Sequence, residues 1–81
     1  MREKILIDLN GLHGGNAKLD LIESYCQQAV DMAGEGKEVI LTGAAPVWMY
    51  LAIAHSLHGK VAILYYKSPV TGDVVIFNHS C

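Results

Sequence analysis

Apolar residues in this 81-residue chain fall into four short continuous runs and two segments with helical spacing. Continuous apolar runs of this length are typical of buried strands, whereas a spacing of three and four residues is typical of helices that pack on one side. The pattern predicts, in order, a strand, a helix, a strand, a helix and two strands. The predicted strands are residues 4–9, 37–42, 60–66 and 73–78.

The first predicted helix follows the glycine-rich segment 10–16, with Asn16 as its N-cap. Gly34 and Gly36 end this helix, because glycine readily adopts the left-handed conformation that follows many helices. Acidic and amide side chains lie mostly elsewhere around it, so one face packs and the other is solvated. The expected packing face consists of Leu19, Ile22, Cys26, Ala29, Val30 and Ala33.

The second predicted helix runs from Pro46 to His58 and stops at Gly59. Helices between consecutive apolar strands imply a mainly parallel sheet. Segment 67–72, which joins the last two strands, is too short for a crossover, so the last strand is expected to be antiparallel. We therefore expect one α/β domain over residues 1–81, a minimal Rossmann-like fold in the order β-α-β-α-β-β.

Composition narrows the possible partners. The chain is 52% hydrophobic and 17% charged, which is more apolar surface than so small a domain easily buries, and this favours a homo-oligomer. A net charge of −2 argues against DNA or another long polyanion as partner. Cys26 and Cys81 indicate neither a disulfide framework nor a zinc site. No signal peptide or membrane span is visible, so a cytoplasmic location is expected.

The second strand ends at the turn Thr42-Gly43-Ala44-Ala45-Pro46, which leads into the second helix. Gly43, Ala44 and Ala45 have almost no side chain, so a ligand can lie directly on their backbone N–H groups. These groups lie at the positive end of a helix dipole, where anions and phosphates bind. The alternative is that the small residues only allow a tight strand-to-helix turn, as in many α/β proteins.

Gly14 and Gly15, in the loop after the first strand, provide a second candidate anion site. Because parallel strands share a carboxyl edge, this loop and the Gly43–Ala45 turn are expected to lie side by side. His13 and Asn16 can add side-chain hydrogen bonds to a base or phosphate, although His13 can equally be a solvent-exposed loop residue. Neither loop has a P-loop ending, and no G-x-G-x-x-G occurs, so ATP and NAD are poor candidates.

Three histidines are expected at the opposite edge of the sheet. His55 and His58 lie one turn apart at the end of the second helix, and His79 ends the antiparallel last strand. Imidazole acts as acid, base or metal ligand near neutral pH, and three such rings can hold a transition metal. The alternative is structural, since a helix C-terminus favours histidine and chain-end histidines are often surface residues.

The second half of the chain resembles the CRISPR-associated ring nucleases of the Csx-three type. The residues that carry the likeness are Gly43-Ala44-Ala45-Pro46-Val47-Trp48, Ala54-His55, His58, Tyr65 and His79-Ser80. The resemblance implies a fold related to cyclic-oligoadenylate sensor (CARF) domains and a homodimer that binds cyclic tetra-adenylate. It also implies a manganese-assisted phosphodiesterase activity that opens this ring.

Carried over by position, His58 matches the principal catalytic histidine of that family and His79 a later one, while Gly43 to Pro46 match its ligand-binding loop. The family has an aspartate after the tyrosine that ends the third strand, where this chain reads Tyr65-Tyr66-Lys67. A hard oxygen ligand for manganese is therefore missing. His58 and His79 remain the candidate metal ligands, and nothing in the sequence itself demands a metal.

The expected function is binding and cleavage of cyclic tetra-adenylate by attack of a ribose 2′-hydroxyl on the adjacent phosphorus. His58 is the expected acid or base, with His79 and His55 in support. The Gly43–Ala45 turn and the histidines lie at opposite edges of one chain. Dimers must therefore stack head to tail to bring the histidines of one dimer onto the ligand bound by the turn of the next. Two alternatives stay open: a binder that sequesters the ring without cleaving it, and a structural dimerisation domain with no nucleotide ligand.

Overall fold

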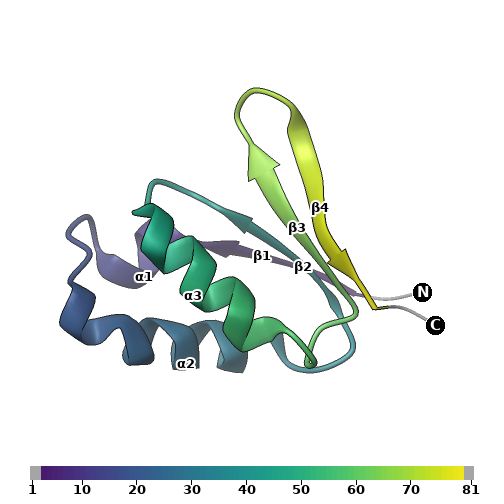
Figure 1. The fold of residues 1–81 in the computed structure, drawn as a ribbon, viewed down its shortest axis with the longest axis horizontal. Helices are drawn as coiled ribbons and strands as arrows, with labels where there is room; N and C mark the ends of the chain where they lie inside the picture. The colour runs from purple at the N-terminus through teal and green to yellow at the C-terminus, as the bar shows by residue number, and fades with distance from the viewer. Residues whose placement is uncertain (1–2, 80–81) are drawn as a thin grey trace.

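The computed structural model describes residues 3–79, which form an α/β molecule around one four-stranded sheet (Figure 1). Cys81 and Ser80 lie outside the described residues. The strands are β1 (Lys4–Asp8), β2 (Glu38–Thr42), β3 (Ile63–Ser68) and β4 (Gly72–Asn78). The helices are α1 (Leu9–His13), the short 3-10 helix η1 (Leu19–Leu21), α2 (Ile22–Ala33) and α3 (Val47–Leu57).

The sheet has the strand order β1-β2-β3-β4, with β1, β2 and β3 parallel and β4 antiparallel to β3. This confirms the predicted fold class and the direction of the last strand. Right-handed crossovers that advance in one direction place their helices on the same face of a sheet. Accordingly, α2 and α3 lie together on one face in Figure 1.

The core lies between these two helices and the sheet. Ile7, Val39, Leu41 and Leu64 alternate along their strands and are fully buried or nearly so on the helix side. From α3, the core receives Met49, Ile53 and Leu57. As a result, the loops that follow β1 and β2 lie at one edge of the sheet, and the C-terminus of α3 lies at the other.

The predicted packing face of α2 is largely confirmed, since Ala29 and Ala33 are buried and Cys26 and Val30 pack against the core, but it lacked Tyr25 and wrongly included Leu19. The buried residues of α2 are Tyr25, Ala29 and Ala33, whereas Cys26 is half-buried and Leu19 precedes the helix with 63% of its surface exposed. The three buried residues repeat every fourth position along α2. Tyr25 can be buried because its hydroxyl accepts a hydrogen bond from the Lys18 amide at 3.0 Å. The apolar spacing thus predicted the helix and most of its packing face, and it missed Tyr25, which lies beside Cys26 on that face.

The glycine-rich segment contains a helix that the sequence did not predict. Asp8 caps α1 by accepting from the Asn10 amide at 2.9 Å, and Gly14 ends it in the left-handed conformation with φ 63°. The prediction of Asn16 as N-cap is wrong, because Leu21 holds that position for α2 after the 3-10 turn. The predicted loop 10–16 therefore contains most of α1, and the 3-10 turn η1 precedes α2.

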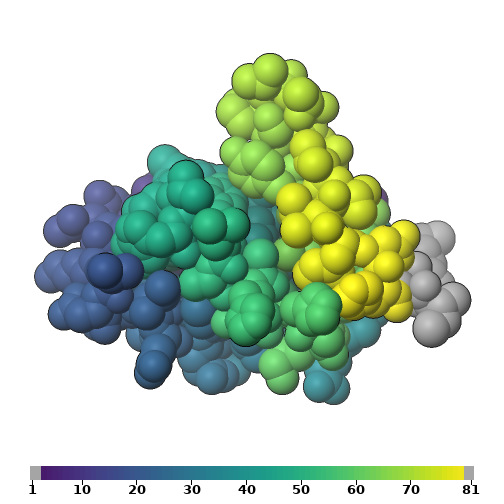
Figure 2. Space-filling model, viewed as in Figure 1, coloured from purple at the N-terminus to yellow at the C-terminus, as the bar shows by residue number. Residues whose placement is uncertain are grey.

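Segment boundaries shift slightly elsewhere. Pro46 is the N-cap of α3 rather than its first residue, and His58 is the C-cap. Lys67 and Ser68 belong to β3 rather than to a loop, and the β3–β4 hairpin stands clear of the body in Figure 2. None of the helices within residues 3–79 combines the length and apolar composition that crossing a bilayer requires.

No helix of the described chain covers the second face of the sheet (Figure 1). Register places one row of side chains across all four strands on that face, and the row consists of Leu6, Ile40, Tyr65 and Val75. Leu6 and Val75 are 56% and 55% exposed. Tyr65 is held there between the Lys4 ammonium, 5.7 Å from its ring centre, and Glu38, which accepts its hydroxyl hydrogen bond at 3.1 Å.

Candidate functional site

The turn after β2 has the open backbone that the sequence predicted. Gly43 has φ 100°, a conformation that favours glycine, and its Cα packs against the Asp8 carboxylate. Within residues 3–79, no acceptor forms a hydrogen bond with the amides of Gly43, Ala44 or Ala45. Three donors just before the N-cap of α3 therefore have no acceptor within the described chain.

The carbonyl groups of the same turn are engaged. The Tyr50 hydroxyl donates to the Gly43 carbonyl at 2.5 Å, and His13 Nε2 lies 2.8 Å from the Ala44 carbonyl oxygen. Partial burial, the nearby Tyr66 and the Asp8 charge raise the pKa of Tyr50 above its ordinary value, which keeps this hydroxyl a donor. The turn is thus anchored from α3 and from α1.

The glycine loop after β1 uses its amides within the chain. Gly14 donates to the Asn10 carbonyl at 3.0 Å, Gly15 to His13 Nδ1 at 2.9 Å, and Asn16 to the His13 carbonyl at 3.3 Å. A ligand that reached this loop would therefore meet side chains and carbonyl groups rather than these three amides. The loop does lie beside the Gly43–Ala45 turn, since His13 bonds to Ala44.

A cavity of about 410 Å³ adjoins the turn at the carboxyl edge of β2 and β3. Its walls include Gly43 and Ala44 on one side and Ser68 on the other, with Tyr50 and Tyr66 between them. The two tyrosine rings meet edge to face, with centres 5.2 Å apart. The sequence did not single out these aromatic residues; the small residues of the turn were the stronger signal.

Lys67 also lines this cavity. It is the residue that stands where the resemblance predicts an aspartate. The chain has a net charge of −2, but Lys67 brings a positive charge to the cavity lined by Gly43 and Ala44. A positive side chain attracts an anionic ligand, whereas an aspartate would repel it.

His58 and His79 come together at the opposite edge. Their ring centres are 4.7 Å apart, and Phe77 packs against both, at 5.3 Å from His58 and 4.7 Å from His79. The His79 amide extends the pairing beyond β4 by donating to the Ala62 carbonyl at 2.7 Å. The convergence of these two histidines is confirmed. Phe77 was missed, although its spacing of two from His79 places both on one face of an extended chain.

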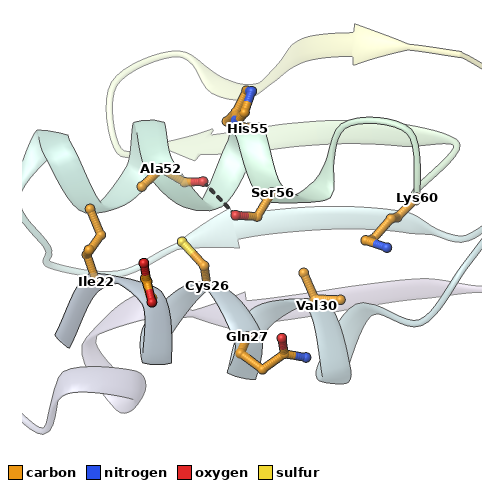
Figure 3. Close-up of a pocket in the computed structure, with 9 residues that line it drawn as sticks. Ile22, Cys26, Gln27, Val30, Ala52, His55, Ser56 and Lys60 are labelled. Carbon is orange, nitrogen blue, oxygen red and sulfur yellow. Dashed lines mark hydrogen bonds between the residues drawn. The ribbon is translucent and has the colours of Figure 1, made fainter.

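His55 does not join this pair. It lines a different hollow of about 630 Å³ between α2 and α3, together with residues such as Cys26, Ser56 and Lys60. In Figure 3 its side chain points away from Cys26, and none of its ring contacts involves His58 or His79. The predicted convergence of all three histidines is therefore wrong for His55.

The donor set of one chain does not fit a manganese ion. Residues 3–79 contain no group of three or more histidine, cysteine, aspartate or glutamate side chains placed to hold a metal. His58 and His79 supply only two nitrogen donors, whereas manganese favours carboxylate, carbonyl and water oxygens.

These features define a small Rossmann-like domain with an open turn, whose amides have no acceptor within residues 3–79, at one edge of the sheet and a histidine pair at the other. The chain belongs to the family of the CRISPR-associated protein Cas_csx3, whose family model matches residues 22–81. The match covers α2 to the end of the chain and so extends further toward the N-terminus than the resemblance at residues 43–80. It leaves out β1 and the glycine loop. No curated protein matches the chain.

Proposed function

We propose that this protein binds cyclic tetra-adenylate and cleaves it as a ring nuclease. The observation that carries the proposal is the open turn: the Gly43, Ala44 and Ala45 amides have no acceptor within residues 3–79, and a cavity of about 410 Å³ adjoins the turn at Gly43 and Ala44. Membership of a CRISPR-associated family supports a cyclic oligoadenylate as the phosphate ligand. The net charge of −2 favours recognition by amides over a broad basic surface.

The proposed reaction is an internal transesterification. A ribose 2′-hydroxyl attacks the adjacent phosphorus, the P–O5′ bond breaks, and the products are a 2′,3′-cyclic phosphate and a 5′-hydroxyl. His58 takes the proton from the 2′-hydroxyl or gives one to the leaving oxygen, and His79, whose ring centre lies 4.7 Å from that of His58, makes the complementary transfer. Acid–base catalysis of this kind accelerates reactions roughly 10²–10⁴-fold. No metal is required for these steps.

Turn and histidines of one chain cannot act on the same phosphodiester. They lie beyond opposite ends of α3, whose 11 residues at about 1.5 Å each span roughly 16 Å. We propose that the histidine edge of one dimer stacks on the open turn of the next, so that the ring lies between two dimers. Such a head-to-tail contact is heterologous.

The proposed dimer forms through the sheet face that carries Leu6 and Val75. This face carries the row Leu6, Ile40, Tyr65 and Val75, which is flanked by Lys4 and Glu38, and it has no helix over it within residues 3–79. A two-fold axis parallel to the strands would place the two Gly43–Ala45 turns at the same end of the dimer. A ring of four identical nucleotides has matching two-fold symmetry, so each chain would hold half of it.

A second candidate is binding without cleavage. It is favoured by Lys67, which stands where the resemblance predicts an aspartate and lines the cavity. A protein of this kind would sequester the ring and lower its free concentration.

The test is incubation of the purified chain with labelled cyclic tetra-adenylate, with and without manganese. We expect linear products with a 2′,3′-cyclic phosphate end, and we expect the His58→Ala variant to bind the ring but cleave it at least about a hundredfold more slowly. The His55→Ala variant is the matched control, since His55 lies apart from the pair. Retention of intact ring by both the natural chain and His58→Ala supports sequestration instead. Absence of binding rejects both candidates.

A further inference from the structure

We infer that His13 and Tyr50 are positioning residues that orient the peptide groups of the Gly43–Ala45 turn, two residues of which, Gly43 and Ala44, line the adjoining cavity. The inference rests on the proposed ligand site and specifies how the chain builds that site. Each of the two residues acts through a carbonyl group of the turn; Tyr50 also lines the cavity, whereas His13 does not.

The hydrogen bonds of His13 determine its tautomer. The Gly15 amide can only donate, so His13 Nδ1, 2.9 Å away, must accept and carries no proton. The ring proton of the neutral imidazole therefore lies on Nε2, which donates to the Ala44 carbonyl at 2.8 Å. One ring thus joins the glycine loop to the turn after β2.

Fixing the Ala44 carbonyl also fixes the Ala45 amide. The peptide bond is planar and trans in this turn, so the C=O of Ala44 and the N–H of Ala45 point in opposite directions. His13 approaches from the side of β1, and β2 lies between β1 and β3 in the sheet. The Ala45 N–H is therefore held pointing away from His13 and the glycine loop.

Tyr50 acts on the preceding peptide group in the same way. Its hydroxyl donates to the Gly43 carbonyl from the first half of α3, so the Ala44 N–H is held pointing away from that helix. With both carbonyls engaged, neither peptide group is free to rotate. A preorganised donor does not lose rotational freedom when a ligand binds, which strengthens binding relative to a mobile loop.

The experiment measures affinity for cyclic tetra-adenylate by calorimetry, using the full 81-residue chain. Loss of one such hydrogen bond changes affinity by roughly threefold to tenfold. We expect His13→Ala and His13→Asn to weaken binding by about tenfold, and Tyr50→Phe by about threefold. His13→Gln is the rescue variant, because its terminal NH₂ can take the place of Nε2, and we expect it to stay within about twofold of the natural chain. Gln27→Ala is the control, since it removes an exposed hydrogen bond to Asp31 on α2.

A role in folding alone would lower the thermal midpoint of the variants without separating His13→Gln from His13→Asn in affinity. Equal binding by those two variants, or unchanged binding by His13→Ala, overturns the inference and leaves the proposed function standing. No binding by the natural chain overturns both. Nitrogen NMR of the ligand-free protein gives an independent readout: a protonated Nε2 and an unprotonated Nδ1 are expected, and the opposite tautomer contradicts the assignment.

Discussion

Gly43 allows the turn between β2 and α3 to adopt a conformation that brings it close to Asp8. Its φ of 100° is one that side chains with a Cβ rarely adopt, and an added Cβ would overlap the Asp8 Oδ1 atom. Asp8 cannot withdraw freely, because the same oxygen caps α1 through the Asn10 amide. The turn, the cap of α1 and the end of β2 therefore share one close contact.

We expect Gly43→Ala to lower the free energy of unfolding by roughly 2–4 kcal/mol, since left-handed strain and overlap with Asp8 add together. Urea unfolding followed by circular dichroism measures this change. Gly11→Ala is the matched control: Gly11 lies inside α1 with nothing within 4 Å of an added Cβ. It is expected to stabilise by up to about 1 kcal/mol, because alanine is the better helix former. Equal effects of the two substitutions would contradict the close contact.

Tyr50 is expected to contribute stability that is lost at alkaline pH. Its pKa is raised in the folded protein, by burial first and then by Tyr66 and Asp8. An unfolded chain loses this proton near pH 10, before the folded chain does, so the contribution is complete below pH 10 and is lost as pH rises through the folded pKa. We expect the urea midpoint of the natural chain to fall more steeply between pH 9 and about pH 11 than that of Tyr50→Phe. Parallel curves would show that Tyr50 does not contribute.

At the scale of helices and strands, the apolar pattern was sufficient for the fold. The four strands and two long helices followed from continuous runs and helical spacing, because burial on one face imposes those periods. Helix α1 could not be predicted in the same way, since its five residues depend on the Asp8 cap and on Gly14 at φ 63°. The packing face of α2 was predicted without Tyr25, because the pattern treated this residue, with its polar hydroxyl, as solvated.

The candidate site was predictable where it follows the strand order. The open turn after β2 and the approach of His79 to His58 both follow from which strand ends lie at which edge. His55 was misassigned because a helical wheel assumes that His58 is helical, whereas His58 is the C-cap with ψ 128° and its side chain leaves the wheel. The bond from His13 to Ala44 joins residues 31 positions apart and depends on two loop conformations, so no periodicity indicates it.

At the scale of the whole molecule, the uncovered sheet face carries the proposed dimer. Leu6 lies in the middle of β1, in a row of side chains that crosses the sheet to Val75 of β4. If two such faces packed together about a two-fold axis, each side chain of the row would be buried in both copies. A single substitution would then affect the dimer at two positions. Full burial of one leucine or valine contributes roughly 1.5–3 kcal/mol.

We expect the natural chain to sediment as a dimer and Leu6→Glu to sediment as a monomer at the same concentration, because an unpaired carboxylate in an apolar interface is strongly unfavourable. Val70→Glu is the control: Val70 is 88% exposed at the tip of the β3–β4 hairpin, away from the row, and this variant should stay dimeric. Sedimentation velocity measures all three. If Leu6→Glu were dimeric and Val70→Glu monomeric, the interface would lie at the hairpin instead. If the natural chain were monomeric, the proposed dimer would be wrong. If each chain holds half of the ring, Leu6→Glu must also lose affinity for cyclic tetra-adenylate although its Gly43–Ala45 turn is unchanged.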